Sequence, residues 1–463
     1  MTTPAKTVHS DSMAIMPYQP KQSSKEFLRS EQERITTEVF RRTLEAEKYC
    51  RGTIFLPTMK RMEMDNYLQR MASEVGFRGA VLLKKEGQVF FCKAYGPKNA
   101  TQLNTIDTRF CIGSMTKMIT AISIMRLFQA GKISSLDDPI KNYLPSKYYN
   151  KLFDGITIRH LLTHTSGLHS YGVFDEDALR QKLYFTDDEL YKLSLINLFF
   201  AKHKITPDQF QDEISKYLPI EVRENYRGIT VLDVLVHELN MAGKEDDQKY
   251  QKIDKLYNYI VDHLQELDIG LLFKPGTDNY YSNSGYFLLG QIIQKISGTS
   301  SFETFIQKDI FDRLGMERTG FSGSYDAEVD ARGFHRDDRT SPFTAINNTR
   351  VYSSKSNAAG GAFSTLRDLD KLDTALYDDS FLLPETREMM FVPHKANPSY
   401  GLGFCIEKSG EVAGHPGCNP GFNSYMMRDV KNRNLYLVLG NTSLEVADSL
   451  AIATQGLRHI LFR

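Results

Sequence analysis

Strand-like segments stand near both ends of this chain, and helical patterns fill the sequence between them. Near the N-terminus, RGAVLLKKEGQVFFCKAYG (78–96) has two runs rich in β-branched and aromatic residues around a Lys-Glu-Gly turn, a pattern typical of a β-hairpin. Near the C-terminus, YGLGFCIEK, GFNSYMMRDV and NLYLVLGNT are also strand-like. We therefore expect an α+β fold, in which an antiparallel sheet of five or more strands is built from both chain ends and flanked by helices.

Composition divides the chain into a tail, an extension and one large domain. Residues 1–25 are polar and rich in Ser, Thr, Pro and Lys, which is typical of disorder. Residues 26–60 form a charged helical extension with sparse apolar positions, so we expect it to lie on a surface or on a partner. Residues 61–463 form the main domain, with a mostly helical lobe inserted at 170–270, where strand signals are few.

Two segments of the helical region resemble each other. NYLPSKYYNKLFDGITIRHLLTH (142–164) recurs loosely as KYLPIEVRENYRGITVLDVLVHE (216–238), and FQAGKI recurs as FAKHKI, with a shift of 72 to 74 residues. A partial duplication would explain the steady shift, with residues 180–240 as a decayed copy of 108–167. The alternative is that two unrelated helix-turn segments have a similar composition.

Charge and composition argue against several function classes. Lys plus Arg and Asp plus Glu both number 57. The sequence has no basic stripe interleaved with aromatic residues, so we do not expect it to bind nucleic acid. The five cysteines form no C-x-x-C pair, and no Walker or Rossmann glycine pattern occurs, so we expect no cofactor. No apolar run of about 18 residues occurs, so we expect no transmembrane segment. The N-terminus lacks an apolar signal-peptide core, which favours the cytoplasm or export without a cleavable signal.

The first candidate catalytic pair is Ser114 and Lys117, in GSMTKMITAISIM, where a polar stretch gives way to an apolar helix. Residues three apart share one face of a helix, and the helix dipole favours an alkoxide on a serine in the first turn. A lysine with a lowered pKa could take the serine proton. The alternative is an N-cap serine beside a solvated lysine, and the pair alone does not decide between the two.

A second motif joins Tyr281 and Asn283 between a Gly-containing turn and an apolar helix. The phenol beside Ser114 could move its proton, as base in acylation and as acid for the leaving group. The Asn283 amide could hold a substrate carbonyl and orient Lys117. Another Y-x-N occurs at 148–150 but lacks these flanking segments, so we set it aside.

A third motif, with His415 and Gly417, lies in GHPGCNPGFNSYMM, where a strand could run beside the serine. Gly417 would let a substrate approach the backbone closely. The N–H of Cys418, with that of Ser114, could form an oxyanion hole. His415 would donate a hydrogen bond near the substrate's carboxylate or carbonyl; the alternative is an ordinary histidine in a Pro/Gly turn.

S-x-x-K, Y-x-N and H-x-G in this order resemble the motifs of the serine β-lactamase and penicillin-binding-protein superfamily. Within it the chain is similar to the class C β-lactamase branch, which includes D-alanyl-D-alanine carboxypeptidases, esterases and LACTB-like proteins. Segments such as ITIRHLLTHTSGL, KPGTDNYYSNSGYFLLGQIIQKISG and AAGGAFSTLRDLDKL also resemble that branch. The resemblance spans residues 75–170 and 270–445, and leaves out the first 60 residues and most of 170–270.

This resemblance implies a β-lactamase/transpeptidase-like fold and a serine hydrolase that cleaves an ester or amide bond through an acyl-enzyme. Ser114 would be the nucleophile, Lys117 its base and Tyr281 a proton carrier. The substrate-binding residues would be Asn283, His415, Gly417 and Cys418. His415 stands where β-lactamases carry the lysine of K-T-G; a mostly neutral imidazole there weakens a β-lactamase or transpeptidase prediction.

Two further alternatives concern metals and lost chemistry. His160 and His164 are four residues apart and could bind zinc, but no third ligand stands at a fitting spacing, so we expect no metal. The alternative function is a catalytically silent or structural relative, in which the 170–270 insertion covers the site. A protein partner could then bind through that insertion or through the N-terminal helix. Otherwise we expect the partner to be a small-molecule or peptide substrate.

Overall fold

The computed structural model describes most of the main domain. The described residues are 58–170, 187–235, 248–321, 326–335, 344–345, 357–407 and 410–442. The predicted tail at 1–25 and nearly all of the predicted extension at 26–60 lie outside them, so both remain predictions.

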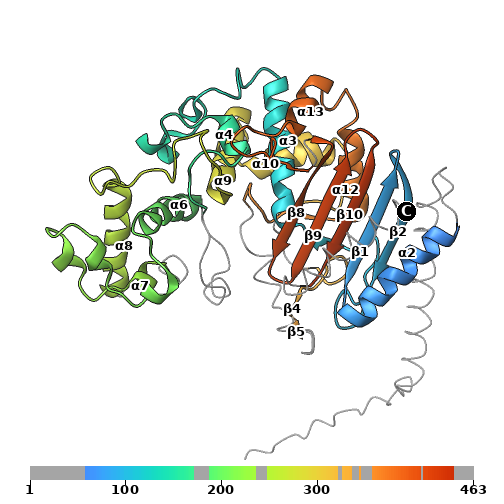
Figure 1. Ribbon diagram of the computed structural model, residues 1–463, viewed down its shortest axis with the longest axis horizontal. Coiled ribbons are helices and arrows are strands. Elements are labelled where there is room, and N and C mark those ends of the chain that lie inside the picture. Colours follow the sequence, from blue (N-terminus) through green and yellow to red (C-terminus); the bar gives the residue numbers. More distant parts are fainter. Residues whose placement is uncertain are drawn as a thin grey trace, which may run out of the picture. The chain divides into compact units, whose positions relative to one another are not determined.

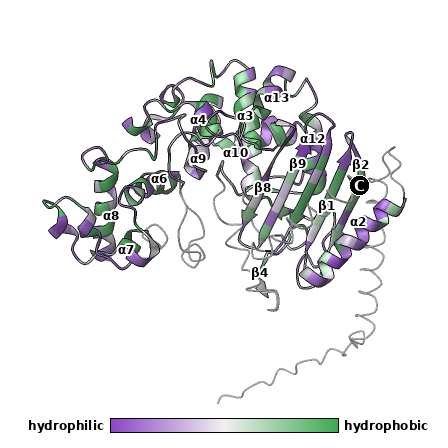
Figure 2. Ribbon diagram, in the orientation of Figure 1, coloured by the Kyte–Doolittle hydropathy of each residue, from purple (hydrophilic) through white to green (hydrophobic). Residues whose placement is uncertain are grey.

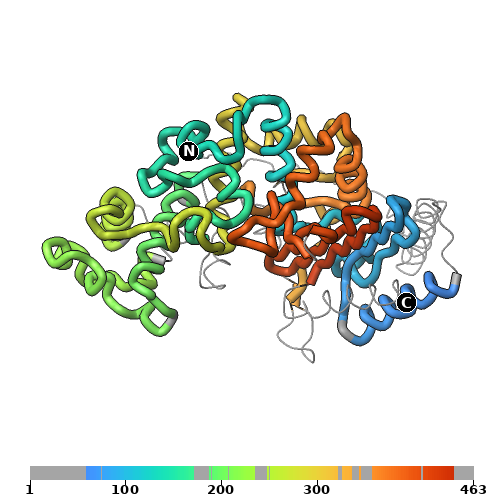
Figure 3. Tube along the Cα trace, turned by 45° about the horizontal axis from the view of Figure 1, so that its top comes forward, coloured from blue at the N-terminus to red at the C-terminus, as the bar shows by residue number. Residues whose placement is uncertain are grey.

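Six antiparallel strands form the main sheet, in the order β2-β1-β10-β9-β8-β7 (Figure 1). The strands are β1 (Gly79–Lys85), β2 (Gln88–Tyr95), β7 (Cys405–Glu407), β8 (Val412–Asn419), β9 (Phe422–Asp429) and β10 (Asn434–Gly440). Because β1 pairs with β10, segments from the two ends of the sequence lie side by side in the sheet (Figures 1 and 3). The expected antiparallel sheet built from both chain ends is confirmed.

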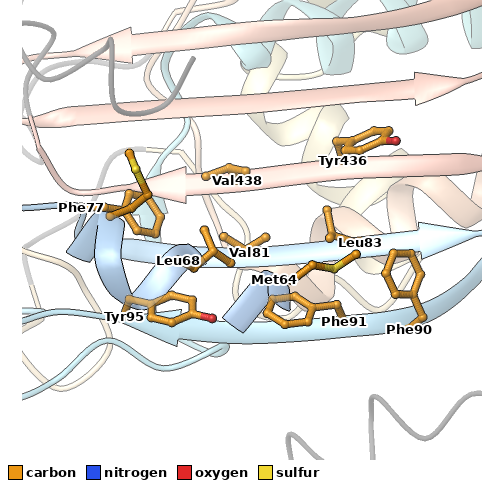
Figure 4. Close-up of a cluster of buried hydrophobic side chains, with 11 residues drawn as sticks. Met64, Leu68, Phe77, Val81, Leu83, Phe90, Phe91, Tyr95, Tyr436 and Val438 are labelled. Atoms are coloured by element: carbon orange, nitrogen blue, oxygen red, sulfur yellow. The ribbon is translucent and has the colours of Figure 1, made fainter. Parts of the chain in front are cut away.

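One face of the sheet is covered by α2 (Thr58–Arg70) and the helical turn Met71–Val75. The strands are mostly hydrophobic, whereas α2 carries both kinds of residue (Figure 2), as expected for a helix with one face on a core. Figure 4 shows the resulting cluster. Its members are Met64, Leu68, Met71, Phe77, Val81, Leu83, Phe90, Phe91, Tyr95, Tyr436 and Val438. Burying one such side chain stabilises the fold by about 1.5–3 kcal/mol.

The opposite face of the sheet packs on α12 (Leu366–Ala375). Side chains alternate along a strand, so Lys84 points away from the α2 cluster. Its Nζ lies 2.7 Å from Asp370 and 3.0 Å from Asp373, both on α12. Arg428 on β9 also pairs with Asp373, at 3.0 Å. These buried pairs fix α12 against the sheet.

A buried helix, α3 (Thr116–Gln129), packs against β8 and against α9 (Asn283–Ser297). The domain also has three short helices, α4 (Ile158–Leu162), α10 (Phe302–Ile306) and α13 (Pro384–Phe391). Two further pairs of strands lie outside the main sheet. In these pairs, β3 (Phe110–Cys111) bonds to β6 (Phe363–Ser364), and β4 (Phe334–His335) bonds to β5 (Thr344–Ala345). Most residues of α3 are fully buried. The N-termini of α3 and α9 therefore bring two of the sequence motifs together.

The described parts of the insertion are helical. They contain α6 (Asp187–Lys202), α7 (Val231–Leu235) and α8 (Gln248–Asp262). Helix α6 packs against α8 and against α9 of the main body. Asn197 on α6 donates to the Ser170 carbonyl at 3.0 Å, which ties the insertion to the segment that precedes it.

The backbone pattern before α4 recurs before α7. Ile140 N–H donates to the Ile156 carbonyl, and Ile214 N–H donates to the Ile229 carbonyl. Each bond closes a loop of 3-10 turns, and each loop leads directly into a short helix of five residues. This local agreement favours the partial duplication over two unrelated segments.

Candidate active site

Ser114 lies in a 3-10 turn, Gly113–Met115, that leads directly into α3. Gly113 has φ +50°, and a Cβ there would stand 2.6 Å from the Cys418 nitrogen on β8. Thr116 Oγ1 donates to the Gly113 carbonyl at 2.7 Å. The turn is therefore held between β8 and its own helix, and it leaves Ser114 half-buried.

The Lys117 amine is completely buried and has three oxygen neighbours. Nζ lies 2.8 Å from Asn283 Oδ1, 2.6 Å from the Ala359 carbonyl and 3.1 Å from Ser114 Oγ. Burial lowers the pKa of Lys117 well below its usual 10.5. A neutral amine has two N–H groups and one lone pair. Since the amide and carbonyl oxygens only accept hydrogen bonds, they take both N–H groups, and the lone pair is left for the Ser114 proton.

The phenol of Tyr281 lies beside both Lys117 and Ser114. Its ring centroid lies 4.8 Å from Lys117 Nζ. Burial raises the pKa of Tyr281, and a hydrogen bond with Ser114 opposes that rise only in part. The residue as a whole is 42 % exposed. Tyr281 therefore keeps its proton at neutral pH, and the geometry suits it to donate a proton rather than to accept the first one.

Asn283 is the first residue of α9 and is fixed by the start of that helix. Ser282 caps the helix, because its hydroxyl accepts the Gly285 N–H at 3.1 Å. The Asn283 N–H donates to Ser170 Oγ at 3.0 Å. These bonds hold the Asn283 side chain over Lys117, where the sequence analysis expected an orienting amide.

His415 is buried, with 2 % of its surface exposed, and both ring nitrogens have partners. Nδ1 contacts the Pro416 carbonyl, which can only accept, so Nδ1 carries the proton. Nε2 then accepts from the Tyr400 hydroxyl at 2.8 Å. Burial and the nearby Lys117 lower the pKa of His415 to about 3. In this arrangement the neutral ring holds Tyr400; a hydrogen bond from His415 to a substrate stays a prediction.

The Cys418 N–H points toward the serine turn. Along an antiparallel strand, the backbone N–H and C=O groups of successive residues point alternately toward the partner strand and away from it. The Val430 N–H donates to the Glu411 carbonyl, so the odd-numbered residues of β8 point these groups toward β9. The even-numbered residues, Cys418 among them, point theirs away from β9. Strand β7 pairs β8 only as far as Gly414, so Cys418 lies past its end and faces Gly113. This geometry supports the predicted oxyanion hole of the Cys418 and Ser114 N–H groups.

Gly417 is surrounded by the chain itself. A Cβ at this position would stand 2.0 Å from the Ile112 carbonyl oxygen and 2.4 Å from Ser424 Oγ. Ser424 Oγ also donates to that carbonyl at 2.8 Å. The observed close approach is therefore that of the turn preceding Ser114. The expected approach of a substrate at Gly417 stays a prediction.

Sequence reasoning missed three contributors to the site. The Ala359 carbonyl is a backbone group in AAGGAF, where no side chain reveals its role. Tyr400 lies in YGLGF, a segment that predicted a strand and resembles the family but contains none of the three motifs. His164, weighed only as a zinc ligand, stacks on Tyr281 with ring centroids 4.3 Å apart.

The described ranges also bear on a metal site and on a membrane span. Among these residues, no group of three His, Cys, Asp or Glu side chains could hold a metal ion. The rings of His160 and His164 contact different neighbours, His394 and Tyr281 respectively. No helix within the same ranges is long and apolar enough to span a bilayer.

Comparison with known proteins relates most of the chain to one family. The family model Beta-lactamase matches residues 64–193 and 207–457. Penicillin-binding protein 4* of Bacillus subtilis (strain 168) is 26% identical over 428 residues, covering 87% of this chain and 76% of that protein. Esterase EstB of Burkholderia gladioli is 33% identical over 140 residues, covering 27% of this chain and 35% of the esterase. The crystal structure of D-amino acid amidase from Ochrobactrum anthropi SV3 with D-phenylalanine has the same fold, with TM-score 0.57 and 20% identity, covering 86% of this chain and 99% of that one.

Replacing Gly417 by alanine should separate β8 from the serine turn. We expect Gly417→Ala to slow acylation of Ser114 by about tenfold or more, because small misplacements of reacting groups have large effects on rate. The rate of labelling by a fluorophosphonate probe measures this. Gly320→Ala is the matched control, since a Cβ there meets nothing within 4 Å. Equal labelling rates in both variants would contradict the packing described for Gly417.

Lys117→Arg should abolish the acceptor for the serine proton, because arginine stays protonated. We expect labelling to slow by about 10²–10⁴-fold, the usual contribution of a general base. In the wild type, the labelling rate should rise with pH as Lys117 loses its proton, with a midpoint below 10.5. Lys295→Arg is the control, since Lys295 lies near the C-terminal end of α9, where its amine donates to the Leu144 carbonyl. A pH profile unchanged in Lys117→Arg would show that another group is the base.

Proposed function

The chain belongs to the β-lactamase family, and we propose that within it Ser114 attacks an ester or amide carbonyl and forms an acyl-enzyme. The observation that carries this proposal is the hydrogen bonding of Lys117. Its two acceptor-only partners direct the amine lone pair to Ser114 Oγ. An N-cap serine beside a solvated lysine, the simple alternative, does not account for a fully buried amine.

Acylation follows from this arrangement. Ser114 Oγ forms a bond to the substrate carbonyl carbon while its proton passes to Lys117 Nζ. The carbonyl oxygen gains negative charge, which the N–H groups of Ser114 and Cys418 stabilise. The bond from the carbonyl carbon to the ester oxygen or amide nitrogen then breaks; Tyr281 gives its proton to this leaving alcohol or amine and is reprotonated from Lys117. The proton bound by Lys117 is thereby returned, and the amine is neutral again.

Deacylation uses the same groups in reverse order. Water replaces the leaving group and attacks the acyl carbon; Tyr281 takes one proton from the water as it passes its own proton to Lys117. The C–O bond to Ser114 then breaks, and Lys117 returns that proton to the serine as the acid leaves. Microscopic reversibility requires that the group that acts as acid in the first half acts as base in the second.

The site favours an ester or a neutral amide over a penicillin-type lactam. His415 is buried and neutral, so it supplies no permanent cation for a carboxylate. The relatives include an esterase and a penicillin-binding protein, so identity alone does not choose the substrate. A catalytically silent relative is the competing function; the complete set of Lys117 contacts favours the enzyme, because lost function removes the selection that keeps a buried amine.

A fluorophosphonate probe should label the wild type at Ser114, and Ser114→Ala should remain unlabelled. The control is Ser123→Ala on the same helix, whose hydroxyl only bonds the Ile119 carbonyl; it should label as the wild type does. Mass spectrometry of the labelled peptide identifies the site. Equal labelling of wild type and Ser114→Ala would refute the proposed nucleophile. Panels of p-nitrophenyl esters and D-amino acid amides then distinguish esterase from amidase activity.

A further inference from the structure

One residue outside the three motifs holds the chain on both sides of Tyr281. The carbonyl of His164 accepts the Tyr280 N–H at 2.9 Å. Its imidazole Nδ1 accepts the Ser282 N–H at 3.1 Å. Tyr280 and Ser282 are the two neighbours of Tyr281 in the sequence. His164 therefore fixes the backbone immediately before and immediately after the phenol.

The His164 ring also supports the phenol directly. Its centroid lies 4.3 Å from that of Tyr281, with an interplanar angle of 38°. Tyr286 and Tyr400 pack around the same imidazole, with centroids 5.1 Å and 4.6 Å away. His164 is only 2 % exposed, whereas Tyr281 is 42 % exposed. The partly exposed phenol thus rests on a ring that is itself enclosed.

The charge state of His164 suits this contact. Burial lowers its pKa well below the usual value. A neutral imidazole has one acceptor nitrogen. Because Nδ1 accepts the Ser282 N–H, the proton is on Nε2, and the acceptor is retained across the working pH range.

The backbone of His164 is unusual as well. Its φ is +59°, in the left-handed region that non-glycine residues seldom adopt. That conformation lets the carbonyl and the side chain of one residue reach two N–H groups of the same segment. An ordinary core histidine would need neither this backbone nor both bonds.

We propose that His164 is a positioning residue for the proton transfer at Tyr281. It holds the peptide groups on both sides of the phenol and stacks on its ring, so the hydroxyl stays within reach of Ser114. The inference rests on the proposed function of Tyr281. It adds a requirement that the three motifs do not contain: an acceptor at the imidazole Nδ1 position and a left-handed backbone at residue 164.

Two substitutions at this position separate the acceptor from the ring. His164→Phe keeps an aromatic ring and removes the acceptor. His164→Asn loses the ring but places Oδ1 near the Nδ1 position, and asparagine tolerates a positive φ. The matched control is His160→Phe, because His160 Nδ1 also accepts a backbone N–H, that of Thr157 at 3.2 Å, but its ring faces His394.

The measurements are kcat and KM for p-nitrophenyl butyrate, the rate of fluorophosphonate labelling and Tm. We expect His164→Phe to lower kcat and the labelling rate by about tenfold or more, with KM within about threefold of wild type. His164→Asn should recover most of the loss in kcat and in labelling rate. His160→Phe should keep both rates within about twofold of wild type, even if its Tm falls as much as that of His164→Phe. If His164→Phe does not fold, His164→Gly, which accepts the backbone angle, replaces it with the same expected loss.

A rate of His164→Phe within about twofold of wild type, or a loss equal to that of His160→Phe, would overturn the proposal. A crystal structure of the variant gives a readout independent of activity. The Tyr281 ring should move by about 1 Å or more, a displacement sufficient to impair catalysis; an unmoved ring also overturns the inference. A displaced ring in a protein whose wild type never labels at Ser114 would instead refute the proposed function alone.

Discussion

The site depends on a buried lysine amine whose neighbours besides the serine are two oxygen atoms that can only accept hydrogen bonds. Lys117 reaches this place because α3 is buried along most of its length, and because the start of α9 and the Ala359 backbone meet above it. A charged ammonium without a carboxylate partner is unfavourable in such a place, since burial penalises the charged form. The fold therefore supplies a neutral amine beside a serine, which is what acyl transfer requires.

The groups around Lys117 are neutral too, and this keeps its pKa low. Burial lowers the pKa values of His164 and His415, so neither ring is cationic, and it raises the pKa of Cys405 to about 12, so the thiol keeps its proton. Tyr281 also stays protonated. Neutral groups that each hold one proton can pass protons to one another without building up charge. They also provide no positive charge that would bind a negatively charged substrate.

Much of this could be predicted from the sequence, because it depends on local patterns. Runs rich in β-branched and aromatic residues near both chain ends predicted the sheet, and the apolar run after Ser114 predicted a helix. The S-x-x-K spacing placed Lys117 on the serine's face of that helix. The other site residues were predicted from the order of the three motifs, since each motif alone was ambiguous. Their meeting at one point is a consequence of the packing of the Gly113–Met115 turn on β8 and of α3 on α9.

Other parts depend on tertiary contacts that leave no pattern in the sequence. The Ala359 carbonyl acts through its backbone, so its residue type is uninformative. No sequence pattern shows that the Tyr400 hydroxyl bonds His415, because this pairing joins segments that sequence spacing does not relate. In the same way, no pattern shows that the Ile112 carbonyl packs against Gly417. The roles of His415 and Gly417 toward a substrate remain predictions.

The central claim is that Lys117 is neutral in the folded enzyme, and NMR titration tests it most directly. Protein labelled with ¹³C at lysine Cε would be titrated, with Lys117→Arg identifying the resonance. The account predicts a Lys117 pKa well below the usual 10.5, so that the amine is largely neutral where the enzyme works. A resonance that titrates at or above 10.5 would contradict it, because the serine proton would then have no acceptor at Lys117.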